Sequence, residues 1–229
     1  MKRPLTTLFL LTSLDGKIST GGTDMRDFDL DLPNIGGVGE GLYQYYDIEA
    51  TTDLWSLNTG RVMAKIGANT NPTPEKIPVS FVILDNTHLD ANGVMYMSAR
   101  AEKLILVTAN KTHPAYSLSL DNLTLIDSEG KTLGDVLEEL YSVYGCEKLT
   151  VQSGGTLNSQ LLREGLIDFV DIVVAPLLVG GRDTPTLVDG ESPTTLDDLE
   201  RLTTLELLGA ERLEHSYLRL TYKVRGHGC

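Results

Sequence analysis

Short runs of apolar residues, separated by glycine, aspartate and proline, divide this chain into predicted strands and helices. A buried strand is expected where several apolar or β-branched residues follow one another between turn residues. The clearest runs lie at residues 78–84 and 103–108, where valine, isoleucine, leucine and phenylalanine predominate. The same criterion predicts further strands at residues 6–12, 53–58, 123–126, 148–151 and 169–175.

Helices are expected where apolar residues recur every three or four positions. Residues 132–144 show this spacing most clearly, because Leu133, Val136, Leu137, Leu140 and Tyr144 share one face and acidic residues take the other. Shorter helices are expected at residues 40–50, after Gly60 and after Gly155. Residues 19–41 are rich in glycine and aspartate and are expected to form a long loop.

The C-terminal residues alternate between apolar and polar side chains, which is typical of a half-buried strand. This pattern predicts an antiparallel hairpin of residues 203–208 and 213–224 that turns at Gly209-Ala210. Upstream, strands alternate with helices, so we expect an α/β fold with a mostly parallel central sheet flanked by helices. No repeat or low-complexity linker interrupts the chain, and residues 1–229 are expected to form a single domain.

Charge and composition narrow the function. The formal net charge is −13, which argues against a general nucleic-acid binder because such proteins need a basic face. No apolar stretch approaches the length that spans a membrane. The two cysteines, Cys146 and Cys229, show no metal-ligand spacing, so we expect no metal site, no disulfide framework and a cytoplasmic location.

The segment at residues 151–158 contains the strongest chemical signal. A β-prone run leads into Gly154-Gly155, and leucines at helical spacing follow. Paired glycines let a ligand approach the backbone, and the start of a helix favours an anion such as phosphate. We therefore expect a cofactor diphosphate at residues 154–160. The same glycines could instead serve only as a tight connection between strand and helix.

Three further junctions follow predicted strands. Residues 13–17 place Ser13, Asp15 and Lys17 after the first strand, where open α/β sheets bind ligands, although Asp-Gly is also ordinary turn chemistry. Thr59-Gly60-Arg61 and Thr108 follow two other strands. Because these junctions belong to one edge of a parallel sheet, they predict a nucleotide-sized ligand there. The glycines at residues 37–41 lack a preceding strand and do not form a dinucleotide fingerprint.

Several of these motifs resemble those of one enzyme family. Leu11-Thr-Ser-Leu-Asp-Gly-Lys-Ile18, Val151-Gln-Ser-Gly-Gly-Thr-Leu-Asn158, Gly165-Leu-Ile-Asp168 and Ala175-Pro-Leu-Leu-Val-Gly-Gly181 are similar, in the same order, to the motifs of the riboflavin-biosynthesis pyrimidine reductases. The resemblance covers essentially the whole chain. It implies a dihydrofolate-reductase-like fold and, because no deaminase domain is present, a stand-alone reductase.

The resemblance implies NADPH-dependent reduction of a ribosylaminopyrimidine phosphate, with hydride passing from the nicotinamide to the anomeric carbon of the sugar. It assigns cofactor binding to two sets of residues: Gly154, Gly155, Thr156, Leu157 and Asn158 at the diphosphate, and Thr59, Gly60, Arg61, Lys65 and Thr108 at the adenosine and its 2′-phosphate. Ser13, Asp15 and Lys17 would face the substrate, with Asp15 and Lys17 as the catalytic residues and Ser13, Gln152 and Arg26 as substrate ligands. Either Asp15 or a water would supply the proton.

Two positions depart from the family pattern. Gln152 stands where the family usually has glutamate, so the site lacks a carboxylate for the pyrimidine. The family's Asp-x-Pro and basic residue reduce here to Thr70-Asn71-Pro72, which leaves the ligand of the substrate phosphate open among Arg26, Lys76 and Arg182. The same scaffold could therefore reduce another heterocycle, such as a pterin, or bind a nucleotide without catalysis. The resemblance also implies a homodimer.

Overall fold

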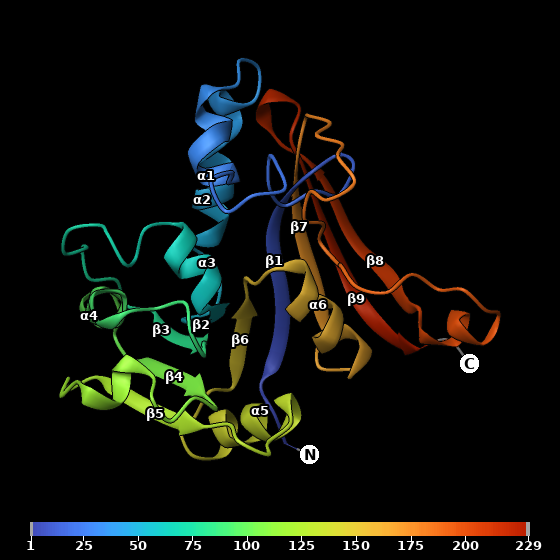
Figure 1. Cartoon of the computed structure of the whole chain (residues 1–229). Helices are drawn as coiled ribbons and strands as arrows, with labels where there is room; N and C mark the ends of the chain where they lie inside the picture. The colour runs from blue at the N-terminus through green and yellow to red at the C-terminus, as the bar shows by residue number, and fades with distance from the viewer. Residues whose placement is uncertain (1, 228–229) are drawn as a thin grey trace. The chain divides into compact units, whose positions relative to one another are not determined.

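Parallel strands form the sheet of the first of two structural units. The computed structural model describes residues 2–227, and its first unit comprises residues 2–5 and 53–153 of this range. The strands pair in the order β5-β4-β3-β2-β6, each pair parallel, as Figure 1 shows. Their bounds are β2 Trp55–Thr59, β3 Ser80–Leu84, β4 Leu104–Thr108, β5 Leu123–Asp127 and β6 Lys148–Val151, and the helices are α3 Gly60–Lys65, α4 Ala91–Arg100 and α5 Leu133–Ser142.

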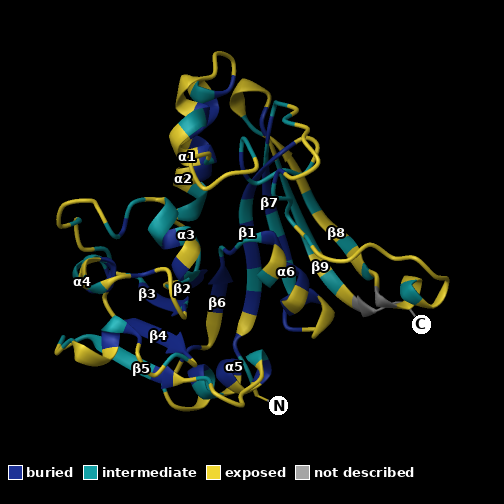
Figure 2. Cartoon of the chain, viewed as in Figure 1, coloured by how far each residue is buried: buried dark blue, intermediate teal, exposed yellow. Residues whose placement is uncertain are grey.

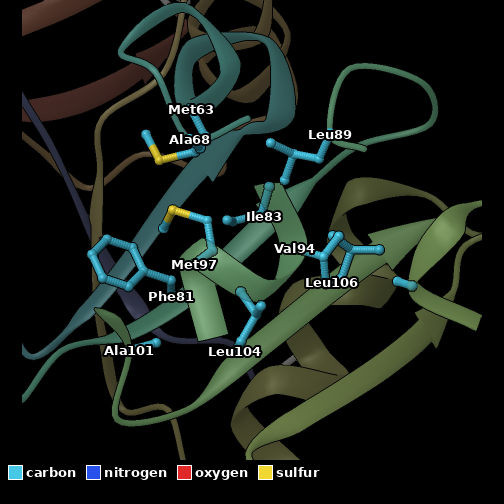
Figure 3. Packing of buried hydrophobic residues seen from close by; sticks show 11 residues of the cluster. Met63, Ala68, Phe81, Ile83, Leu89, Val94, Met97, Ala101, Leu104 and Leu106 are labelled. Carbon is cyan, nitrogen blue, oxygen red and sulfur yellow. The ribbon is translucent and has the colours of Figure 1, made fainter. Parts of the chain in front are cut away.

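The core of this unit lies between the sheet and its helices. β4 is buried at every position and β3 at all but its last, because helices cover both faces of a parallel sheet. Figure 3 shows Met63 of α3 and Met97 of α4 close to Phe81 and Ile83 of β3. α5 begins with a capping box, in which Thr132 and Asp135 each satisfy a backbone N–H of the other.

The second unit comprises residues 6–52 and 154–227 of the described range and combines parallel with antiparallel pairing. Its strand order is β1-β7-β9-β8, in which β1 and β7 are parallel and β9 is antiparallel to both neighbours. The bounds are β1 Leu5–Ser13, β7 Phe169–Ala175, β8 Thr203–Arg212 and β9 Leu218–His227. The helices are α1 Phe28–Asp31, α2 Tyr43–Glu49 and α6 Gly155–Arg163.

Tyr217 anchors the core of the second unit. Its ring is fully buried, and its hydroxyl donates to the carbonyl oxygen of Val38 at 2.8 Å. A methyl group at Gly41 would lie 2.6 Å from this ring. The glycine is therefore needed for packing, which agrees with the rejection of a dinucleotide fingerprint at residues 37–41. Phe9 stacks on Tyr45 in the same core, with ring centroids 5.1 Å apart.

The predicted α/β class, with mostly parallel strands and a C-terminal antiparallel hairpin, is confirmed. The hairpin turn was predicted at the wrong place: β8 continues through Gly209 to Arg212, and the turn lies at residues 213–217. Gly209 sits at a register irregularity opposite Thr221, where a side chain would crowd the Thr221 hydroxyl. The turn instead uses His215 and Ser216 in the left-handed region, at φ 52° and 65°.

Two other expectations need correction. Residues 19–41 are not wholly a loop, because α1 lies within them, and residues 32–34 and 39–41 form 3₁₀ turns. α4 has no counterpart among the predicted helices, although Asp90 caps it by accepting from the backbone N–H of Gly93. A single domain over residues 1–229 stays a prediction. Cys229 lies outside the described residues.

Candidate active site

The start of α6 has one open glycine and one crowded glycine. Gly154 is the N-cap, and a methyl group added there would meet nothing within 4 Å. A methyl group at Gly155 would lie 2.3 Å from the carbonyl oxygen of Thr186 and 2.4 Å from Oδ2 of Asp189. The first amides of a helix have no acceptor within it, so the N–H groups of Gly155, Thr156 and Leu157 remain available to an anion on the open side. Asn158 is fully buried and donates to the carbonyl oxygen of Leu187 at 2.8 Å.

The turn at residues 13–17 follows β1 in the same unit. The Ser13 hydroxyl donates to Oδ1 of Asp15 at 2.6 Å and accepts from the backbone N–H of Lys17 at 2.9 Å. Asp15 also accepts from the backbone N–H groups of Val179 and Gly180 at 3.1 and 2.7 Å. The Ser13 hydroxyl and these two amides hold the pKa of Asp15 down at about 2. The carboxylate is therefore ionised at neutral pH, which favours the second of the two expected proton sources, a water.

Two of the three cationic candidates of this unit, Lys17 and Arg26, have partners among the described residues, and the third, Arg182, is exposed. Nζ of Lys17 donates to the carbonyl oxygens of Gly181 and Thr184 at 2.8 and 2.9 Å. Arg26 pairs with Asp31 at 3.3 Å, and its side chain is 60% exposed. A substrate phosphate at Arg26 would share the guanidinium with this carboxylate.

In the first unit, Thr59 ends β2 and caps α3. Its side chain accepts from the backbone N–H of Val62 at 3.4 Å. Arg61 is exposed and Lys65 is half-buried on the same short helix, where a spacing of four residues places both cations on one side. Thr108 is buried at the end of β4, and its hydroxyl donates to the side chain of Asn86 at 3.0 Å.

Asp85 is a buried carboxylate at the carboxyl end of β3, the middle strand of the first unit. It follows β3, its side chain is fully buried, and a methyl group at Gly60 would lie 2.1 Å from its Cγ. The carboxylate accepts from the backbone N–H groups of Thr87, His88 and Leu89, and the ring nitrogens of His88 and His113 lie 3.1 Å from its oxygens. Gly60 is therefore required by the packing of Asp85.

Hydrogen bonding fixes the protonation of this pair. Nδ1 of His113 accepts from the backbone N–H of Ala115 at 3.2 Å, so Nε2 carries the ring hydrogen and donates to Asp85. Burial alone would raise the pKa of Asp85, but the amides of Leu89 and His88 and the His113 ring hold it below its usual value. A neutral histidine thus supports a buried, ionised aspartate.

Gln152 belongs to a chain of polar side chains that crosses β6 and β2. Its Oε1 accepts from the hydroxyl of Ser56 at 3.0 Å, and this hydroxyl accepts from the amide of Asn58 at 2.9 Å. All three residues are in the first unit. The position where the family usually has glutamate is therefore a hydrogen-bonded neutral amide.

The predicted site residues fall into one group in each unit. The first unit holds Gln152 after β6, Thr59 at the end of β2, Thr108 at the end of β4, and Gly60, Arg61 and Lys65 in α3. The second unit holds Ser13, Asp15, Lys17, Arg26 and the start of α6. Among these, residues 13–17 and 154–158 both contact the segment 177–189. None of the hydrogen bonds described above joins Arg26 to residues 13–17 or to residues 154–158.

The sequence patterns did not single out Asp85, His113 or Asp189. A signal existed for Asp85, because an aspartate directly after a buried strand often accepts hydrogen bonds from backbone N–H groups of the turn that follows. No comparable signal marks Asp189, whose role depends on residues far away in the sequence. Within residues 2–227, no helix is long and apolar enough to cross a membrane, and no three histidine, cysteine or acidic side chains gather as metal ligands.

Solved structures with the same fold are reductases and related proteins. The chain resembles Acinetobacter baumannii RibD with a TM-score of 0.66 and 18% identity, over 98% of this chain and 59% of that one. A pyrimidine reductase-like protein from Corynebacterium diphtheriae gives a TM-score of 0.64 at 14% identity, over 96% and 92% of the two chains. At these identities the likeness establishes the α/β fold alone.

Sequence comparison identifies the family. Residues 4–218 match the model of the RibD C-terminal domain, and the chain belongs to this family. Curated relatives match over shorter stretches. The 2,5-diamino-6-ribosylamino-4(3H)-pyrimidinone 5′-phosphate reductase of Methanothermobacter thermautotrophicus is 45% identical over 51 residues, which are 22% of this chain and 23% of the relative. The reductase of the same name from Archaeoglobus fulgidus is 40% identical over 64 residues, or 28% and 29% of the two chains.

Proposed function

We propose that this protein is an NADPH-dependent reductase of a ribosylaminopyrimidine 5′-phosphate in riboflavin biosynthesis. The family match over residues 4–218 supports the reaction class, and the names of the curated relatives support the substrate class. The observation that carries the proposal is the open N-cap of α6, where Gly154 has space for a ligand beside unpaired backbone amides. A cytoplasmic location fits the buried free thiol of Cys146.

The residues at the start of α6 fit a dinucleotide. The amides of Thr156 and Leu157 would bind diphosphate oxygens on the open side of Gly154, while Asp189 covers Gly155 on the other. Arg61 and Lys65 would bind the 2′-phosphate that distinguishes NADPH from NADH. When bound, the cofactor supplies the hydride for the anomeric carbon of the substrate.

The remaining residues would bind and orient the substrate. Ser13 and the turn that it stabilises would face the pyrimidine and sugar phosphate, with Arg26 as a ligand of that phosphate. Gln152 would hydrogen-bond the pyrimidine through its amide. Since Asp15 is ionised, a water would give its proton to the ring oxygen as the bond from this oxygen to the anomeric carbon opens.

One observation favours a second candidate function. The side chain at position 152 is a neutral amide tied to Ser56, so it cannot offer the charge that a glutamate would give to the N–H groups of a pyrimidine. A different heterocycle, such as a pterin, would then be reduced on the same scaffold.

The first experiment measures NADPH oxidation with the pyrimidine phosphate, together with binding titrations of NADPH and NADH. We expect turnover and at least about tenfold tighter binding of NADPH, because a phosphate held by two cations contributes about 1.4 kcal/mol or more. Arg61→Ala should remove most of this preference. Lys148→Ala, a change of an exposed cation at the start of β6 in the same unit, is the matched control and should leave it intact. Tight binding without turnover would favour the pterin alternative, and failure of both nucleotides to bind would refute the reductase proposal.

We also propose a homodimer that uses the hairpin of β8 and β9. β8 ends the strand order of the second unit, and Figure 2 shows its exposed positions in yellow. Leu205, Leu207 and Leu208 are 43%, 55% and 56% exposed there. Apolar side chains on an edge strand favour cover by another chain.

Light scattering after size-exclusion chromatography tests the dimer. The wild-type protein should elute with twice the mass of the chain, and Leu207→Lys should shift it to the mass of one. Leu199→Lys places the same charge on another exposed leucine of this unit and should not change the mass. A wild-type protein of single-chain mass at micromolar concentration would contradict this proposal.

A further inference from the structure

Residues 177–189, here called the strap, run beside the turn at residues 13–17. The two segments share backbone hydrogen bonds from Leu14 to Leu177, from Ile18 to Pro185 and from Leu187 to Gly16, at 2.9, 3.0 and 2.9 Å. Asp15 accepts from the amides of Val179 and Gly180, and Lys17 donates to the carbonyl oxygens of Gly181 and Thr184. Both charged side chains of the turn are therefore engaged by the strap.

The other end of the strap contacts the start of α6. The backbone N–H of Asp189 donates to the carbonyl oxygen of Gly155 at 3.1 Å, and Asn158 donates to the carbonyl oxygen of Leu187. Oδ1 of Asp189 accepts from the backbone N–H and the hydroxyl of Thr186 at 3.0 and 2.6 Å. The strap is thus closed on itself at the point where it covers Gly155.

The strap contains no helix or ladder strand, and most of its residues are exposed or half-buried. Gly180 and Gly181 of the strap both have positive φ, at 70° and 78°. Only glycine adopts this left-handed conformation readily. A segment of this kind opens locally unless specific bonds hold it. Hydrogen bonds to a charged partner are about twice as strong as neutral ones, so Asp15, Lys17 and Asp189 provide the strongest of these bonds.

We propose that Asp15, Lys17 and Asp189 are positioning residues that hold the strap as one body and couple the turn at residues 13–17 to the first turn of α6. The inference deepens the proposed function, because it makes cofactor binding at α6 depend on a turn that faces the substrate. Asp15 acts here through the strap, at the opposite end from Asp189. Coupling of this kind is reciprocal, so a change at either end is felt at the other.

Amide hydrogen exchange of the protein without ligands tests the coupling directly. Asp15→Asn leaves one side-chain oxygen for two backbone donors, Val179 and Gly180, so at least one of these amides loses its acceptor. Faster exchange there is a local effect. The decisive amides are those of Asp189 and Asn158 at the far end, whose exchange should accelerate about tenfold. In Asp189→Asn, the same acceleration should reach Val179 and Gly180. Lys17→Met should loosen both ends.

Asp183→Asn is the matched control. Asp183 is an exposed carboxylate of the strap itself, and its side chain makes no hydrogen bond or ion pair within the described residues. The Asp183→Asn substitution removes the same charge as Asp15→Asn and should change every exchange rate less than about twofold. NADPH titration should give about tenfold weaker binding for Asp15→Asn and Asp189→Asn, and unchanged binding for the control.

Three results would count against these proposals, each in a different way. If Asp15→Asn accelerates only the amides of Val179 and Gly180, the strap does not transmit and the inference is wrong. If the wild-type protein binds no NADPH, the proposed function fails, while the exchange rates still decide whether the two turns are coupled. Equal effects of Asp183→Asn and Asp15→Asn would show that net charge, and not the hydrogen bonds, is responsible.

Discussion

Replacing Asp85 with alanine should lower the free energy of unfolding by about 3–5 kcal/mol, the range seen when one partner of a buried charged network is removed. Three backbone amides and the buried His113 ring would then lack their acceptor in a place that water does not reach. The expected loss is a large part of the stability of a typical domain.

Urea denaturation of the wild-type and variant proteins measures this effect. Asp127→Asn is the control, because Asp127 is an exposed carboxylate at the end of β5 in the same unit and pairs with Lys111 at the surface. Surface pairs contribute about 0–1 kcal/mol, so the control should stay close to wild type. A loss in Asp85→Ala no larger than in the control would mean that the buried network does not stabilise the fold.

Urea denaturation at several pH values tests whether Asp85 stabilises the fold in its ionised form. The pKa of Asp85 in the folded protein lies below its unfolded value of about 3.9, so its contribution is complete above the unfolded pKa and is lost as pH falls through the folded one. The difference between wild type and Asp85→Asn should therefore be constant from about pH 5 to 7 and shrink below about pH 4. A difference that grew with acid would contradict the ionised state assigned to Asp85.

One added methyl group should destabilise the protein at Gly155 and have almost no effect at the neighbouring Gly154. Gly155→Ala brings a carbon to within 2.3 Å of the Thr186 carbonyl oxygen, so the strap must move, and overpacking of this kind costs about 1–3 kcal/mol. Gly154→Ala meets open space at φ −73°, and the free energy of unfolding should change by less than about 0.5 kcal/mol.

NADPH binding tests the role of Gly154 directly. If the diphosphate lies against Gly154, a bulky side chain should exclude it, and Gly154→Val should weaken NADPH binding about a hundredfold or more while the protein stays folded. Circular dichroism melting verifies the fold, and fluorescence titration measures the affinity. An unchanged affinity in Gly154→Val would show that the diphosphate does not lie against Gly154.

Local patterns were sufficient for much of the fold. β3, β4 and β7 are almost continuous apolar runs, and the first two of these predictions differ from the structure only at their ends. The hairpin turn was misplaced because Gly209-Ala210 carries a common turn signal, whereas the turn itself uses His215 at positive φ, which no local rule favours. Sequence periodicity does not report a β-bulge, so Gly209 was assigned to the wrong structure.

The candidate site was predictable only in part. Glycine turns and strand ends have local signatures, and the structure gives Gly154 the open backbone that its sequence context implies. The partners of Asp15 and Asp189 could not be predicted, because they come from a segment without periodicity whose bonds join residues up to 165 positions apart. The expectation of NADPH came from the resemblance to a reductase family, while the tertiary contacts of Gly155 showed that this glycine has a packing role.

Cys146 has a consequence for handling the protein. Its side chain is buried in the first unit, its Sγ donates to the carbonyl oxygen of Lys148 at 3.4 Å, and burial, with a smaller effect from Asp53, raises the pKa of the thiol to about 12. Nucleophilic attack by sulfur requires the thiolate, which is almost absent at such a pKa. Alkylating labels and mild oxidants should therefore leave this position untouched for as long as the native sheet persists, and its modification would report unfolding.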